Sequence, residues 1–242
     1  MGTYSSKTGC AYTDNKRRLA AFDLLYCELD WLETSSSAWE LAVCIFDDYC
    51  YAVNSNIYRV TIQNNDIQLI AITCLMLASK YHDEVDYFNI HRVPLTLDGV
   101  ERDGILAMEL NILKTLNYNF LSYQPCYHWM STSKHSMNYR DLRRLLINIA
   151  YCHPELRDYY SYKSATLVTV ANKLVAKKRI KARHRHLAEC LAAAFAKLHS
   201  DIENGCCHIE FLTDYYYEVC DSPIFHSCLR SLYDKKLVTG HL

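Results

Sequence analysis

Three ionisable residues occupy positions where the helical pattern of the sequence predicts hydrophobic residues. Asp47, Lys80 and Glu109 each lie one helical turn after a large apolar residue. A charge on a buried face costs several kcal/mol unless it is paired and hydrogen-bonded. Arg18 can pair with Asp47, and Lys80 with Glu109. Such pairs can fix helix packing, or a Lys–Glu pair at the rim of a core can hydrogen-bond another protein, and spacing alone leaves both interpretations open.

No short motif for catalysis or nucleotide binding occurs in the sequence. The patterns G-x-G-x-x-G, G-K-[ST], H-E-x-x-H and G-x-S-x-G are all absent from its 242 residues. These absences leave no candidate catalytic residue or cofactor site and are consistent with a chain that is not an enzyme.

Twelve cysteines raise the question of disulfides or a metal site. There is no C-x-x-C pair, no N-x-[ST] sequon and no signal peptide. The cluster at 206–208, Cys-Cys-His, lacks the ligand spacing of structural zinc sites, so no metal is expected. Most cysteines lie in apolar stretches, among them Cys44, Cys74, Cys152 and Cys190. Small core cysteines in a reducing compartment, the nucleus or cytoplasm, are the expected arrangement.

The elements that must position these residues are predicted to be helices. Six Gly and four Pro are few for this length, and so favour helices joined by short loops. The uncharged run at 69–78 is about half a membrane span and predicts a buried helix. Apolar residues recur every three or four positions in 14–33, 36–53, 65–82 and 99–116.

Helical patterns begin again after the break at Gln124–Pro125. The stretch at 164–176 resembles 69–78 in its small and branched apolar residues, which suggests two bundles in tandem. The expected division is a flexible leader at 1–13, a first bundle at 14–123 and a second at 124–236. Helices of the second bundle are predicted near 124–134, 138–152, 161–177, 184–200, 206–220 and 223–236.

Two terminal or surface features concern membranes and nucleic acids. MGTYSS at 1–6 fits the myristoylation pattern M-G-x-x-x-[ST], which would acylate Gly2, although a flexible leader can match by accident. One acyl chain holds a protein weakly, and a membrane partner is expected only if Gly2 is modified.

KKRIKARHRH at 177–186 can be a localisation or nucleic-acid patch. The net charge of −1 favours a solvated loop and argues against a nucleic-acid partner.

Three segments of the first half resemble the cyclin box. They read SSAWELAVCIFDDY, DIQLIAITCLMLASKYHDE and GILAMELNILKTLNYNFLSYQP. Five positions typical of the family occur in order: Arg18, Asp47, Leu69, Lys80 and Glu109. The likeness covers about residues 14–125, and the remainder fits the expected second bundle. The resemblance implies an all-α fold of two tandem five-helix cyclin-box bundles.

The resemblance also implies roles for these residues. Arg18 and Asp47 would form the buried pair that ties the first helix to the second. Lys80 and Glu109 would hydrogen-bond the backbone of a cyclin-dependent protein kinase beside its αC helix. Two neighbours would add apolar contact: Tyr81 and Leu113. The αC glutamate of a kinase must pair with its β3 lysine before phosphoryl transfer. The implied function is therefore a regulatory subunit that binds and activates the kinase by positioning αC.

The first helix departs from the family pattern. Residues 17–25 read RRLAAFDLL where many cyclins carry M-R-A-I-L-x-x-W, the patch that docks substrates and inhibitors of the kinase. The matching positions are Arg17, Ala20, Ala21 and Leu24. Without the Trp, we expect a shallow, more basic groove that docks weakly. The link at 52–65 is longer than usual, and is expected to be a surface loop or an added kinase contact.

Alternative functions share the fold. One is a binding module that sequesters a kinase or its inhibitors without activation. Another is a general transcription factor with cyclin-like repeats, which the retained Lys80–Glu109 pair and the near-neutral charge disfavour. A cyclin that consists of little more than its two cyclin boxes resembles the virus-encoded cyclins, which are similar to D-type cyclins. The length of the chain and its divergence from the family pattern suggest a viral origin.

Overall fold

A computed structural model describes most of the chain. Every regular element in this part is a helix, which confirms the predicted all-α fold class. The chain divides into two compact units, residues 1–120 and 121–242, while the proposed domain limits place the boundary after residue 123. The described residues are 15–27, 35–55, 64–82, 101–120, 122–123, 125–130, 137–207 and 209–233.

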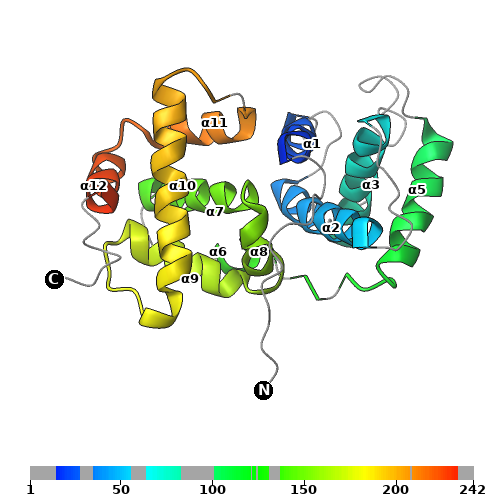
Figure 1. Cartoon of the computed structure of the whole chain (residues 1–242), viewed down its shortest axis with the longest axis horizontal. Coiled ribbons are helices and arrows are strands. Elements are labelled where there is room, and N and C mark those ends of the chain that lie inside the picture. Colours follow the sequence, from blue (N-terminus) through cyan, green and yellow to red (C-terminus); the bar gives the residue numbers. More distant parts are fainter. Residues whose placement is uncertain are drawn as a thin grey trace. The chain divides into compact units, whose positions relative to one another are not determined.

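The first unit is organised around α3 (Asn64–His82). This helix packs against α1 (Asn15–Cys27), α2 (Ser36–Ser55) and α5 (Arg102–Thr115), and Figure 1 shows it between α2 and α5. All residues from 70 to 79 are buried. A helix that is apolar on every side can be stable only inside a bundle, which explains its central place.

The predicted link at 52–65 is partly helical. Residues 52–55 belong to the last turn of α2, and 64–65 begin α3. Residues 56–63 lie outside the described part, as do the leader at 1–13 and the acylation candidate Gly2.

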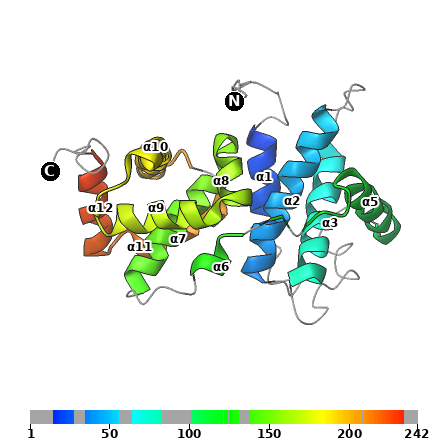
Figure 2. The ribbon, with the colours of Figure 1, turned by 90° about the horizontal axis from the view of Figure 1, so that it is seen from below.

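The second unit is organised around α7 (Met137–Tyr151), which packs against α8, α9, α10, α11 and α12. Figure 2 shows this unit from below. Besides α7, the described residues of this unit form the helices α9 (Ser164–Val175), α10 (Arg185–Glu203), α11 (Glu210–Val219) and α12 (Pro223–Tyr233). The shorter elements described are α6 (Tyr127–Met130), α8 (Arg157–Tyr162) and the 3₁₀ turns η1 (Pro154–Leu156) and η2 (Ala182–His184).

Candidate functional site

A buried ion pair joins α1 to α2. The Arg18 guanidinium donates from Nε to Oδ1 of Asp47 and from Nη2 to Oδ2, both at 2.7 Å. Both side chains are inaccessible to solvent, and the guanidinium also lies 4.3 Å from the centre of the Phe22 ring. Two parallel charge-assisted bonds in a dry environment fix both the distance and the orientation of the helices. The structure thus brings together the two residues that the sequence paired.

A second ion pair joins α3 to α5. Lys80 Nζ donates to Oε1 and Oε2 of Glu109 at 3.0 and 3.2 Å. The Lys80 side chain is 42% exposed and that of Glu109 is 18% exposed. The periodicity predicted a buried position for Lys80, but its side chain is exposed because the last turn of α3 extends beyond the core. The pair lies at the surface, where unused hydrogen-bonding capacity faces solvent.

The apolar residues predicted beside this pair are partly accessible. Tyr81 is 51% exposed, and its ring meets Phe120 edge-on with centroids 6.5 Å apart. Leu113, on α5, is half-buried. Lys80, Glu109, Tyr81 and Leu113 thus all belong to the adjoining helices α3 and α5 of one unit.

Two further leucines on α5 were missed by the sequence analysis. Leu106 is 41% exposed and Leu110 is 47% exposed, although both are large apolar residues. With Leu113 they repeat at intervals of four and three, which places them on one side of the helix with Glu109. We call Leu106, Glu109, Leu110 and Leu113 the α5 stripe. Nothing in the sequence marks these two leucines as exposed, because only the structure shows that the buried positions of α5 are Ile105 and Ile112.

A separate hollow of about 530 Å³ lies between α1 and α3. All four residues of the predicted docking patch line it: Arg17, Ala20, Ala21 and Leu24. Three more lining residues were not predicted: Lys16, Ile67 and Gln68. Lys16 and Arg17 are both exposed, and two alanines form part of the wall. The hollow therefore combines a small apolar surface with two positive charges.

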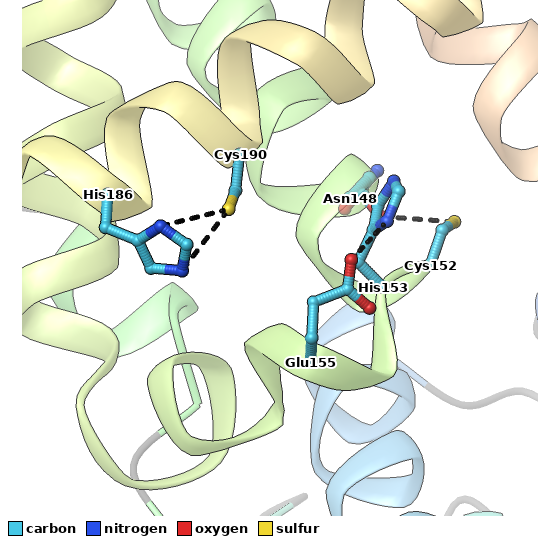
Figure 3. Close-up of polar contacts among 6 residues, drawn as sticks. All are labelled: Asn148, Cys152, His153, Glu155, His186 and Cys190. Carbon is cyan, nitrogen blue, oxygen red and sulfur yellow. Dashed lines mark hydrogen bonds and ion pairs between the residues drawn. The ribbon is translucent and has the colours of Figure 1, made fainter. Parts of the chain in front are cut away.

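No group of three His, Cys, Asp or Glu suited to a metal ion occurs among the described residues. Two pairs are shown in Figure 3: His186 with Cys190, whose Sγ lies 3.7 Å from Nε2, and His153 with Glu155, joined at 3.0 Å. Burial, with the Glu155 and Glu189 charges, raises the pKa of the Cys190 thiol. A thiol that stays protonated is a poor metal ligand and a poor nucleophile.

No disulfide joins the cysteines of the described part, and six of them are buried: Cys44, Cys50, Cys74, Cys126, Cys152 and Cys228. His208, of the cluster at 206–208, lies outside the described residues. None of the helices described has the length and apolar character required to cross a membrane.

Comparisons with known proteins show similarities within the first half of the chain. Residues 8–121 match the family "Cyclin, N-terminal domain". The chain is similar to cyclin-A2-3 of Arabidopsis thaliana, with 31% identity over 98 residues, which cover 40% of this chain and 21% of that protein. It is also 30% identical over 87 residues to the putative cyclin-B3-1 of the same plant, covering 36% of this chain and 22% of that protein. The matched region spans about a fifth of either relative.

These relatives are named as A-type and B-type cyclins, and nothing in the comparisons supports a viral or D-type origin. The matched region contains α1, α2, α3 and α5, and with them both ion pairs and the hollow. Residues 8–121 match the cyclin N-terminal domain family, so the first unit is similar to the N-terminal domain of cyclins.

Proposed function

We propose that the chain is a regulatory subunit that binds and activates a cyclin-dependent protein kinase. Cyclins are not enzymes, so the proposal assigns no chemistry to this chain. The observation that carries it is the Lys80–Glu109 pair, held at the surface beside the exposed side chains of Tyr81, Leu106 and Leu110. Action on such a kinase places the protein in the nucleus or cytoplasm.

The chemistry of this surface suits a helix and its adjoining backbone. Lys80 Nζ has three donors and Glu109 two acceptor oxygens, so the pair can bond a partner's carbonyl and N–H groups without giving up its own contact. The leucines of the α5 stripe would lose contact with water on binding, which is favourable at about 25 cal/mol per Å². Polar bonds would set the register, and apolar burial would supply the affinity.

Activation follows if the bound surface fits only one arrangement of the kinase. The αC helix can lie close to or away from the β3 lysine, and phosphoryl transfer requires the close arrangement. A partner shifts this equilibrium only by its difference in affinity for the two states. We propose that the α3–α5 surface binds the close state more tightly.

The test is retention of the chain on a panel of immobilised cyclin-dependent kinases, followed by phosphorylation of histone or retinoblastoma protein. The Lys80→Ala/Glu109→Ala variant should lose retention and keep its helical circular-dichroism signal. The matched control, Glu189→Ala/Lys197→Ala, removes one exposed acid and one exposed base from α10 and should behave as the native chain. If no kinase retains the native chain, the proposal fails.

Sequestration without activation is the second candidate, and the unusual hollow between α1 and α3 favours it. Ala20 and Ala21 offer little apolar surface, and Lys16 and Arg17 add positive charge, so docking of the usual substrates and inhibitors through this site would be weak. A chain that retains a kinase and leaves its turnover unchanged would be a sequestering module.

A further inference from the structure

Positive charge is concentrated in one segment of the second unit. From Tyr159 to Ala188 the sequence has eight of the chain's 26 Lys and Arg and none of its 27 Asp and Glu. Outside this segment 18 basic residues face all 27 acidic ones, a net charge of −9. A chain of nearly zero net charge thus has a strongly basic segment within an acidic remainder.

Six of these cations lie between the end of α9 and the first residue of α10, and we call them the α9–α10 basic surface: Lys177, Lys178, Arg179, Lys181, Arg183 and Arg185. All six are exposed. Within the part of the chain that the structure describes, none of them forms an ion pair with a carboxylate. Lys177 instead donates to the hydroxyl of Ser227 on α12.

Hydrogen bonds hold this connection in a folded conformation. The Lys178 N–H donates to the Lys173 carbonyl at 2.8 Å and the Lys177 N–H to the Leu174 carbonyl at 3.2 Å, the bonding pattern that closes an α-helix. Lys177 has φ of +52°, where glycine is the usual residue. Lys173 Nζ also donates to the Arg179 carbonyl at 3.4 Å. A folded connection does not suit a localisation peptide that must be read in extended form, and it presents its charges as a fixed surface.

Cations of this segment lie close enough to His184 to affect its protonation. His184 lies in η2 among them, and its pKa is lowered by burial and by the charges of Arg183, Lys173 and Lys181. The next acid along the chain is Glu189, one helical turn beyond Arg185. With no paired carboxylate to offset them, these charges favour an anion from another molecule.

The side chains of this surface fit phosphate better than nucleic acid. Three of the six cations are arginines, whose planar forks bind phosphate oxygens in pairs. Binding of single strands relies on large aromatic rings that stack with bases, and no Phe, Tyr or Trp occurs from Lys177 to Arg185. The net charge of −9 outside the segment would also repel a long polyanion. A short anion with two charges is the better match.

We propose that the α9–α10 basic surface binds a phosphorylated peptide segment of a partner protein, with Arg179 and Arg183 holding the phosphate. This binding is separate from the proposed kinase contact, which uses α3 and α5. It would let the phosphorylation state of a partner control its recruitment to the complex.

The test uses the full chain and a fluorescein-labelled 12-residue peptide with one central phosphoserine between neutral residues. Fluorescence anisotropy should show that the phosphopeptide binds at least tenfold more tightly than its unphosphorylated twin. Arg179→Ala/Arg183→Ala should weaken phosphopeptide binding at least tenfold. The control Arg140→Ala/Lys197→Ala removes the same charge from exposed positions on α7 and α10 and should change binding less than twofold.

Three results would overturn the proposal. Equal affinity for both peptides would show that the phosphate is not recognised. Equal losses of phosphopeptide affinity in the two double variants would show that the peptide responds to the overall charge of the protein and not to Arg179 and Arg183. Tighter binding of a labelled single-stranded oligonucleotide would identify nucleic acid as the ligand. Lys80→Ala/Glu109→Ala should leave phosphopeptide binding unchanged, so this result is independent of the kinase assay.

Discussion

Two ion pairs of the first unit join residues that are 29 positions apart, yet they differ in exposure. The Arg18–Asp47 pair is inaccessible, whereas Lys80 is 42% exposed. A broken buried pair leaves a charge without compensation, while an exposed pair contributes little because water screens it. The buried pair should therefore govern stability, and the surface pair should govern binding.

Asp47→Ala should lower the free energy of unfolding by about 3–5 kcal/mol, because the Arg18 guanidinium would remain buried without its carboxylate. Glu109→Ala should lower it by less than about 1 kcal/mol. Urea denaturation followed by circular dichroism measures both. Equal losses for the two substitutions would contradict the division of roles.

Leu110→Ala should weaken kinase binding about tenfold and change the free energy of unfolding by less than about 0.5 kcal/mol. Leu110 is 47% exposed, so folding buries only part of it, whereas a bound partner would cover it. Isothermal titration with a kinase that retains the native chain measures the affinity. Asn111→Ala, a neighbouring exposed substitution away from the stripe, is the control. Unchanged affinity for Leu110→Ala would remove the α5 stripe from the proposed interface.

The residues that the sequence identified were those whose charge conflicts with an apolar pattern. The structure joins Arg18 to Asp47 and Lys80 to Glu109, and the requirement that a buried charge has an opposite partner applies only to the first pair, because Lys80 is exposed. Leu106 and Leu110 were missed because neither carries a charge that conflicts with an apolar pattern. Which apolar face stays uncovered depends on the packing of neighbouring helices, and periodicity does not contain this information.

At the scale of helices, long amphipathic segments were predicted well and interruptions without Gly or Pro were not. The stretch at 161–177 was expected as one helix, but α8 ends at Tyr162 and α9 begins at Ser164. Lys163 between them has φ of −131° and ψ of 32°. Both helices pack against α7, so tertiary contacts rather than a local breaker determine this break. The break at Gln124–Pro125, by contrast, was visible because proline restricts the preceding residue.

Replacing two glycines by alanine, one within a helix and one after a helix, should change the stability in opposite directions. Gly104 lies within α5, where an added Cβ would meet Leu69 at 3.8 Å, an ordinary contact. Gly104→Ala should therefore raise the free energy of unfolding by about 0.8–1 kcal/mol through helix propensity. Gly205 follows α10 with φ of +66°, and Gly205→Ala should lower it by about 1–2 kcal/mol. Urea denaturation compares the pair, and a loss for Gly104→Ala would mean that α5 and α3 pack more tightly than described.

At the scale of the whole molecule, many titratable groups serve as core residues. Burial raises the pKa of the Cys228 thiol from 9.0 to about 12 and that of the Tyr49 hydroxyl from 10.0 to about 12. Burial likewise raises the pKa of Cys50 and of Cys74. These groups occur in both units, so alkaline conditions act on both cores. Each remains protonated in the folded chain at pH values where the unfolded chain releases its proton.

These buried groups should consequently leave the stability of the protein unchanged between about pH 7 and 9 and lower it above pH 9. Above this pH the unfolded chain binds fewer protons than the folded chain, so the free energy of unfolding decreases by about 1.4 kcal/mol per pH unit for each buried thiol. The decrease should continue until the folded pKa is reached, about 12 for Cys228. Urea denaturation between pH 7 and 11 measures the slope. Cys228→Ala should make the decrease less steep by about 1.4 kcal/mol per pH unit, the contribution of one buried thiol. Cys206→Ala, at an exposed position, should leave the slope unchanged. An unaltered slope in Cys228→Ala would show that this thiol is not protected by the folded core.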